Sequence, residues 1–228
     1  MDPFGVRSLP AHRRIGRAYY LAREIAPDVA DARHVLDVGC GKGFVAYHLG
    51  AMLGCRVDGV DLIAETDAPI PYRQLTGGEL PYPTACFDAV LFCYVLHHTP
   101  DPRVLLREAW RVLRPGGRVV VYEDMPVTTF DRALCRLHEL MWSAGTCTFL
   151  DVATWCRIFA ADAARFELVA HRAVSRFRDP THPVRRHRFV LQRPPHVGRG
   201  GPGSTVAGGE PRAQYGLSRS RGRPRFFQ

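Results

Sequence analysis

The stretch VLDVGCGKGF (35–44) places three glycines within five positions, directly after a run of apolar residues. Such a pattern is typical of a buried strand that turns into a helix. Glycines at this turn let a flat or charged ligand approach the backbone and the helix N-terminus. A dinucleotide loop, G-x-G-x-x-G, would need its third glycine at residue 44, which is Phe44. The stretch therefore predicts a cofactor loop of another class, with a glycine turn that binds nothing as the alternative.

Helix and strand signals alternate on both sides of this loop. Helical periodicity covers 12–26, 43–53 and 103–113, and short apolar runs predict strands at 34–38, 56–62, 71–75, 87–95 and 118–124. A helix and a sixth strand are expected within 149–177, and a last strand at 185–193. The order implies parallel strands joined by right-handed crossovers, hence an open, doubly wound α/β sheet of the Rossmann-like kind. In such sheets the ligand binds beyond the carboxyl ends of the strands.

Composition narrows the class of protein. A chain of 228 residues with 46% hydrophobic residues can build one core of ordinary size. No window has the apolar length of a membrane span or a secretory leader, so we expect no membrane span and a cytoplasmic location. The seven cysteines are scattered without any C-x-x-C pair, which argues against a disulfide framework and predicts no metal site.

The net charge of +9 is unevenly distributed along the chain. Residues 1–175 carry 19 basic and 20 acidic side chains, whereas 176–228 carry 12 basic and 2 acidic ones. From 194 onward the sequence is rich in Gly, Pro and Arg and lacks apolar periodicity, so we expect a disordered tail. Its arginines are able to bind nucleic acid. Arginine is used in place of lysine throughout the chain, however, with Lys42 the only lysine against 30 arginines, so nucleic acid is an unlikely partner.

Several motifs together resemble the class I S-adenosylmethionine-dependent methyltransferases, in particular their ubiquinone-biosynthesis-like, small-molecule branch. The loop reads D-x-G-x-G-x-G from Asp37, and Asp61 ends the second predicted strand. GGELPYPTACFDAVLFCYVLHH (77–98) and LREAWRVLRPGGRVVVYED (106–124) are similar to later segments of that family. The resemblance covers about 30–125, and it implies about seven strands with the last one antiparallel between its neighbours.

The resemblance also implies a set of cofactor-binding residues for S-adenosylmethionine and its product S-adenosylhomocysteine. Glycines form a platform under the methionine part, Asp37 reaches its ammonium side or orders the loop, Asp61 holds the ribose and the backbone at Cys93 faces the ammonium group. Thr76 stands where relatives have an adenine-binding Asp, and only ten residues separate Asp61 from Tyr72, so the usual second helix is expected to be short or missing. The full set is Asp37, Gly39, Cys40, Gly41, Gly43, Asp61, Leu62, Thr76, Gly77 and Cys93.

The predicted organisation is one methyltransferase domain, 1–193, followed by the basic tail, 194–228. Within the domain we expect an N-terminal helix (12–30), a cofactor-binding half (34–124), an apolar lid over the acceptor (125–150) and a C-terminal helix with strands (151–193). An apolar lid favours a hydrophobic or aromatic small molecule as methyl acceptor. The sequence does not indicate the oligomeric state.

No catalytic residue is assigned from the sequence. Transfer from a sulfonium mainly requires alignment, and the need for a base depends on the acceptor. Two other functions stay open: a nucleic-acid or protein methyltransferase that uses the basic tail, and a regulatory protein that binds S-adenosylmethionine without turnover. Candidates on the acceptor side are Tyr94, His97, His98, Glu123, Asp124 and His138.

Overall fold

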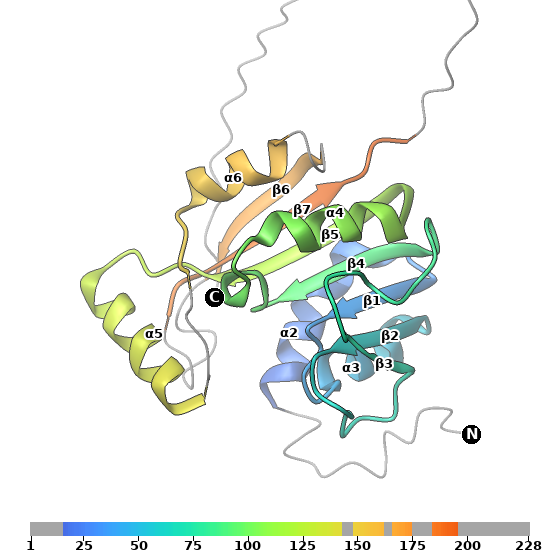
Figure 1. The fold of residues 1–228 in the computed structure, drawn as a ribbon, viewed down its shortest axis with the longest axis horizontal. Helices are drawn as coiled ribbons and strands as arrows, with labels where there is room; N and C mark the ends of the chain where they lie inside the picture. The colour runs from blue at the N-terminus through green and yellow to red at the C-terminus, as the bar shows by residue number, and fades with distance from the viewer. Residues whose placement is uncertain (1–15, 143–147, 162–165, 175–183, 196–228) are drawn as a thin grey trace, which may run out of the picture. The chain divides into compact units, whose positions relative to one another are not determined.

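The computed structural model describes residues 16–142, 148–161, 166–174 and 184–195. In this part of the chain one seven-stranded sheet runs through the molecule, with helices on both faces (Figure 1). Its strand order is β3-β2-β1-β4-β5-β7-β6. The strands are β1 (His34–Val38), β2 (Arg56–Asp61), β3 (Tyr72–Gln74), β4 (Phe87–Cys93), β5 (Leu113–Asp124), β6 (Glu167–Val174) and β7 (Arg186–Gln192).

Strand directions confirm the predicted fold class. Strands β1 to β5 pair with one another in parallel. The last strand, β7, lies between β5 and β6 and runs antiparallel to both. The chain is therefore an α/β protein with an open, mostly parallel sheet, and its single reversed strand brings the start of β7 to the edge where β5 ends.

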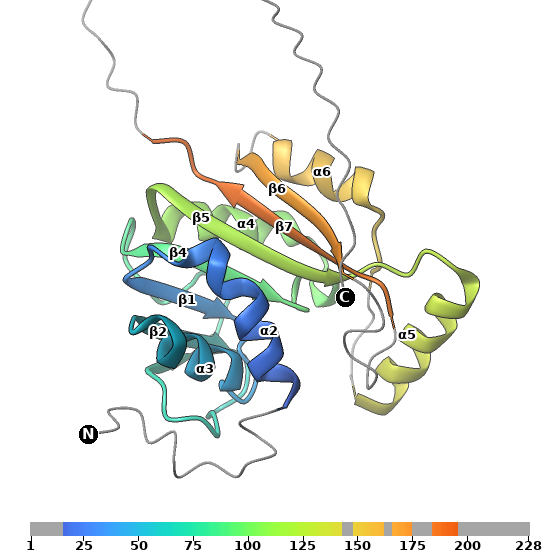
Figure 2. The same ribbon diagram turned by 180° about the vertical axis from the view of Figure 1, so that it is seen from behind.

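Helices cover the two faces of the sheet separately (Figure 2). On one face lie α2 and α3, and on the other lie α4 and α6, while α5 stands beyond the carboxyl end of β5. Aspartates begin two of these helices: Asp101 accepts from the Arg103 N–H at 3.0 Å, and Asp151 accepts from the Thr154 N–H at 2.7 Å. The helices are α2 (Arg17–Ile25), η2 (Ala26–Val29), α3 (Phe44–Leu53), η3 (Leu96–His98), α4 (Pro102–Val112), α5 (Thr129–Trp142) and α6 (Val152–Ala160).

Buried strands supply side chains to two hydrophobic cores, one on each face. Along β5, Val119 and Val121 join the core under α4 and α6, whereas Val120 joins the core under α2 and α3. This alternation follows from the two-residue period of a strand, and it explains why 119–122 is a continuous apolar run rather than an alternating one.

The elements can be compared with the sequence expectations in three places. The first described helix begins at Arg17, and residues 12–15 of the predicted helix lie outside the described residues. The connection from β2 to β3 contains no helix, as the short spacing predicted. Strand β5 begins at Leu113 rather than 118, because Leu113 pairs with Phe87 before a register shift in the ladder.

Two further expectations from the sequence concern the tail and the absence of a membrane span. Residues 196–228 of the predicted tail lie outside the described residues. Within the described residues, no helix combines the length and the apolar character that crossing a membrane requires.

The turn from β1 into α3 depends on a close contact between Gly39 and Val95. Gly39 has a φ of +70°, and a Cβ built on it would lie 2.4 Å from Val95 Cγ2. Gly41 has a φ of +53°, but a Cβ there would meet nothing within 4 Å. The first glycine is therefore required for packing, whereas the second leaves open space above the loop.

We predict that Gly39→Ala destabilises the protein more than Gly41→Ala. Both alanines would sit in the left-handed region at a cost of about 1–2 kcal/mol, and Gly39→Ala adds overpacking of about 1–3 kcal/mol. Urea unfolding followed by tryptophan fluorescence measures both losses. Equal losses in the two variants would contradict the packing role of Gly39.

Candidate functional site

Three neighbouring strands end together at one edge of the sheet. Val38 of β1 pairs with Val60 of β2 on one side and with Phe92 of β4 on the other. The next residues along these strands are Gly39, Asp61 and Cys93, so the parallel register brings the predicted loop, the predicted ribose-binding carboxylate and the end of β4 to one place. This is the carboxyl edge at which open α/β sheets bind ligands.

The amides of the glycine loop are already engaged within the protein. The N–H groups of Gly39 and Cys40 donate to Val60 O at 2.7 and 3.3 Å, and that of Gly43 donates to Cys40 O at 2.9 Å. Gly41 donates its N–H to Asp61 Oδ2 at 2.7 Å. These four amides are therefore used within the protein, and at these positions the loop offers a ligand its shape rather than anion-binding donors.

Asp37 is a buried carboxylate beneath this loop. Its side chain is 1% exposed, and neither carboxylate oxygen has a hydrogen-bond donor among the described residues. Burial, with the nearby Asp61 charge, raises the pKa of Asp37 to about 7; the Ala46 N–H, which lies outside hydrogen-bonding geometry, offsets only part of this rise. A carboxylate without donors is costly in a protein interior, and a cationic partner would compensate it.

Asp61 joins the loop to the chain that follows β2. Its Oδ1 accepts from the Leu62 N–H at 2.6 Å, and its backbone O accepts from the Leu75 N–H at 2.7 Å. A carboxylate has about four acceptor sites, so hydroxyl groups of a ligand can bind beside these backbone donors. Leu62 is 70% exposed, and Thr76 and Gly77 follow Leu75 in an exposed loop. The predicted adenosine-side residues thus gather around Asp61.

The two cysteines of the predicted set are not reactive thiols. Burial, together with the Asp37 carboxylate, raises the pKa of both the Cys40 and the Cys93 thiol. Both groups therefore stay protonated at neutral pH, and neither is suited to nucleophilic chemistry. What they contribute at the site is volume and backbone.

Glu123 holds the loop after β4 in place. Its side chain is fully buried, and its Oε1 accepts from the N–H groups of Val95 at 3.1 Å and Leu96 at 2.7 Å. Its Oε2 binds His97 Nδ1. Glu123 is one of the acceptor-side candidates from the sequence, but its carboxylate binds the segment after β4 and lies at the start of the short helix η3.

His97 connects this loop to the segment after α5. Its backbone O accepts from the Thr148 N–H at 2.8 Å, and its ring stacks on Phe149 with centroids 5.4 Å apart. With 6% exposure and Nδ1 bound to Glu123, His97 is a packing and positioning residue. Neighbouring His98 is exposed.

The other acceptor-side candidates lie in different surroundings. Tyr94 is half-buried with a φ of +61°, and the Arg17 guanidinium lies 4.5 Å from its ring centroid. Burial raises the pKa of Tyr94 to about 12, so the phenol is protonated at neutral pH. Asp124 is buried. The side chain of His138 lies outside the described residues.

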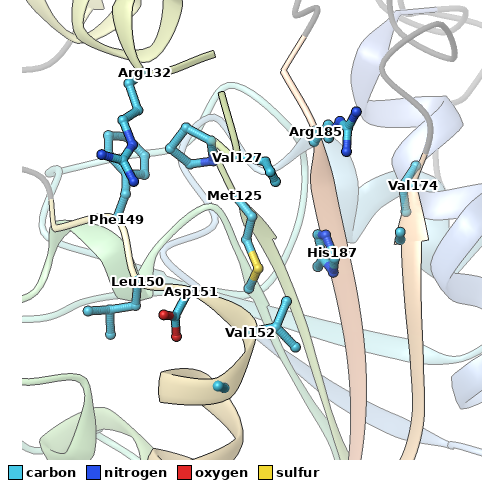
Figure 3. A pocket seen from close by; sticks show the side chains of 13 residues that line it. Met125, Val127, Arg132, Phe149, Leu150, Asp151, Val152, Val174, Arg185 and His187 are labelled. Carbon is cyan, nitrogen blue, oxygen red and sulfur yellow. The ribbon is translucent and has the colours of Figure 1, made fainter. Parts of the chain in front are cut away.

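A cavity of about 860 Å³ opens at the same sheet edge, beyond β5, β7 and β6 (Figure 3). Residues from the predicted lid form one wall, including Met125, Val127 and Phe149. Two of its other residues, Arg132 within the predicted lid and Arg185, are not among the candidates named from the sequence. No local pattern singles them out, because α5 and the start of β7 meet only in the folded chain.

The site combines an open loop with acidic rather than basic surroundings. Asp37 and Asp61 flank the loop, and the nearby Lys42 ammonium pairs with Asp67 at 3.1 Å. No group of three or more His, Cys, Asp or Glu side chains suited to a metal ion occurs within the residues that the structure describes. The arrangement fits a ligand with a positive charge and hydroxyl groups better than a pyrophosphate, which requires free amide donors.

Comparison with known sequences agrees with this chemistry. The family described as "Methyltransferase domain" matches residues 36–121. The 27-O-demethylrifamycin SV methyltransferase of Amycolatopsis mediterranei is 35% identical over 100 residues, 38% of this chain and 37% of that protein. The demethylmenaquinone methyltransferase of Tropheryma whipplei is 38% identical over 120 residues, 48% of this chain and 49% of that protein. This chain therefore spans less than half the length of these curated relatives.

Comparison with solved structures supports the fold. The [4+2]-cyclase SpnF matches with a TM-score of 0.62 and 20% identity, covering 78% of this chain and 81% of that one. Geranyl diphosphate C-methyltransferase from Streptomyces coelicolor A3(2) matches with a TM-score of 0.61 and 16% identity, covering 76% and 78%. At such identities the likeness concerns the fold, which hosts a cyclase as well as methyltransferases. The sequence match, the strand order and the loop together place residues 36–121 in the class I S-adenosylmethionine-dependent methyltransferase family.

Proposed function

We propose that the protein binds S-adenosylmethionine and transfers its methyl group to a small molecule with an apolar or aromatic part. The observation that carries the proposal is the acidic loop: an unpartnered buried carboxylate, Asp37, under a turn whose open position is Gly41. The methionine part of this cofactor carries an ammonium, a sulfonium and one carboxylate, and its net positive charge suits that environment. A dinucleotide, with its pyrophosphate, does not.

Each member of the predicted set takes a role in this proposal. The loop Gly39, Cys40, Gly41 and Gly43 accommodates the methionine part, and Asp37 neutralises its ammonium group. Asp61 accepts the ribose hydroxyls, and exposed Leu62 covers the adenine. Thr76 and Gly77 border the adenine from the loop after β3, and the backbone at Cys93 closes the methionine side.

The chemistry asks little of the side chains beyond positioning. The cofactor supplies a methyl group on a sulfonium whose leaving group is a neutral thioether, so no general acid is required. The protein's part is to hold the acceptor in line and to exclude water. Glu123 and His97 contribute by fixing the loop after β4, which lies between the glycine loop and the cavity. No metal is part of the proposal.

A small acceptor is favoured over a polymer. The relatives named above act, by their names, on rifamycin and menaquinone precursors, and the cavity beside the loop has a largely apolar wall. A nucleic-acid or protein substrate bound by the basic tail has no comparable support. A regulatory protein without turnover is the remaining alternative, and a methyl-transfer assay distinguishes it.

We also propose the domain boundaries and setting expected from the sequence. Residues 1–193 form the methyltransferase domain and 194–228 a basic extension, with 125–150 covering the acceptor. A cytoplasmic location agrees with the reduced, scattered cysteines of the sequence.

The proposal is tested by incubating the full chain with S-adenosylmethionine and a small-molecule extract. Mass spectrometry should find compounds that gain one methyl group and the matching S-adenosylhomocysteine. Cofactor binding in calorimetry without any methylated product in a broad acceptor screen would identify a binding protein instead.

Asp61→Asn is expected to weaken S-adenosylhomocysteine binding by about tenfold or more, because hydrogen bonds to a charged group contribute about 1.5–3 kcal/mol. Isothermal titration calorimetry measures the change. The matched control is Asp31→Asn, since Asp31 is exposed and precedes β1 at the opposite edge of the sheet. Unchanged affinity in Asp61→Asn, or no binding by the unmodified chain, would refute the cofactor assignment.

The affinity for S-adenosylhomocysteine is expected to rise by about tenfold between about pH 5.5 and about pH 7, because each unit below a pKa lowers the charged fraction about tenfold. The pKa of Asp37 is raised to about 7, so without ligand its carboxylate is about half charged at pH 7 and almost entirely protonated at about pH 5.5. Asp37→Asn should bind weakly and show a flat profile over this range. A wild-type profile that is equally flat would contradict the pairing.

Unfolding without ligand provides an independent control for Asp37. Because its pKa is raised on folding, the folded state binds more protons than the unfolded state between about pH 4 and pH 7. This group therefore lowers stability as pH rises through that window. The wild type should lose stability relative to Asp37→Asn over the same range, as measured by urea unfolding.

A further inference from the structure

The cavity beyond β5 adjoins the loop that Glu123 fixes. Phe149 lines the cavity on one side and stacks on His97 on the other, with ring centroids 5.4 Å apart. Met125 follows β5 and lines the cavity. Its N–H donates to Arg185 O at 2.8 Å. A molecule in the cavity would therefore lie next to the loop between the cofactor site and β5.

The walls of this cavity are apolar, but its charged groups are mainly cationic. Figure 3 shows Arg132 reaching down from α5 on one side and Arg185 at the start of β7 on the other. Among the residues that the structure describes, neither guanidinium has an ion-pair partner. The apolar lining consists of Met125, Pro126, Val127, Phe149, Leu150, Val152, Ala153, Ala173 and Val174.

The one carboxylate in the lining is already engaged. Asp151 Oδ1 accepts from the Thr154 N–H at 2.7 Å, which caps α6. Hydrogen bonds from Thr154 hold the pKa of Asp151 below its ordinary value. Asp151 therefore caps α6, and no ion pair joins its carboxylate to Arg132 or Arg185 among the described residues.

His187 contributes a neutral polar group to the same wall. Its Nδ1 lies 2.8 Å from His171 Nε2, so a ring N–H of one histidine donates a hydrogen bond to the ring nitrogen of the other. Burial, then the His171 and Arg185 charges, lowers the pKa of His187, so the ring is uncharged at neutral pH. Arg185 and His187 are two residues apart in extended chain, which places both on one face. The cavity thus has a positive end and an apolar body.

We propose that this cavity recognises small amphipathic anions, with Arg132 and Arg185 binding a carboxylate or phosphate group and the apolar wall holding the rest. Resting on the proposed function, this inference makes the methyl acceptor an acid rather than a neutral molecule. Two guanidiniums suit planar or tetrahedral oxyanions, to which they donate in parallel. The apolar lid predicted from the sequence would contact only the apolar part of such an acceptor.

A pair of matched probes tests the proposal without knowledge of the acceptor. The fluorescent dye 8-anilinonaphthalene-1-sulfonate carries the anion, and N-phenyl-1-naphthylamine has the same rings without it. Arg132→Gln and Arg185→Gln should each weaken the sulfonate by about three- to tenfold and leave the neutral dye unchanged. Added salt should weaken only the sulfonate.

The control variant is Arg107→Gln, since Arg107 is an exposed arginine on α4 outside the cavity. It should bind both dyes as the unmodified chain does. Circular dichroism verifies that all variants fold. Equal loss of both dyes in the arginine variants, or no loss of either, would overturn the proposal.

Competition identifies the kind of anion. Phenylacetate or phenyl phosphate should displace the sulfonate dye. The better competitor of the two identifies the anionic group, carboxylate or phosphate, that the arginines prefer. Phenylacetamide should not displace it, and equal competition by acid and amide would refute recognition of charge. Calorimetry with S-adenosylhomocysteine on the same variants separates the two proposals. Unchanged cofactor binding together with weakened binding of the sulfonate dye supports both. If the protein does not bind the cofactor at all, only the proposed function is refuted.

Discussion

The contact between Gly39 and Val95 is the constraint on which the site depends. The chain leaves β1 in a left-handed conformation and passes so close to the loop after β4 that no side chain fits between them. Glu123 of β5 holds that second loop through two backbone N–H groups. Three strands are thereby linked at their carboxyl ends, and the geometry around Asp37 and Asp61 follows from their parallel register.

This constraint also explains how the loop distinguishes between ligands. A glycine turn is often associated with phosphate binding, because its amides point outward. Here the amides of Gly39, Cys40, Gly41 and Gly43 are used to fold the loop itself. The remaining electrostatic character comes from carboxylates. This glycine-rich loop thus provides an environment for a cation. It differs from a phosphate-binding loop in the acceptors to which its N–H groups donate.

Local patterns in the sequence were sufficient to predict the strands, the helices α3, α4 and α6, and the position of the loop. Apolar runs and glycines report on local conformation, and the parallel order follows from their alternation. The sequence did not predict that Glu123 is a buried clamp or that Arg132 and Arg185 share a cavity. These facts depend on which distant segments meet, and β5 extends to Leu113 for the same reason: its pairing with Phe87 is a tertiary contact.

The reversed strand β7 has a consequence for how such a protein can diversify. Because β7 enters the sheet from the carboxyl edge, its first residues reach the cavity although they lie more than sixty positions after the end of β5 in the chain. Substitutions at Arg185 or His187 alter the cavity without touching β1, β2 or the glycine loop. The selectivity of the cavity can therefore evolve separately from the half of the domain that the family shares.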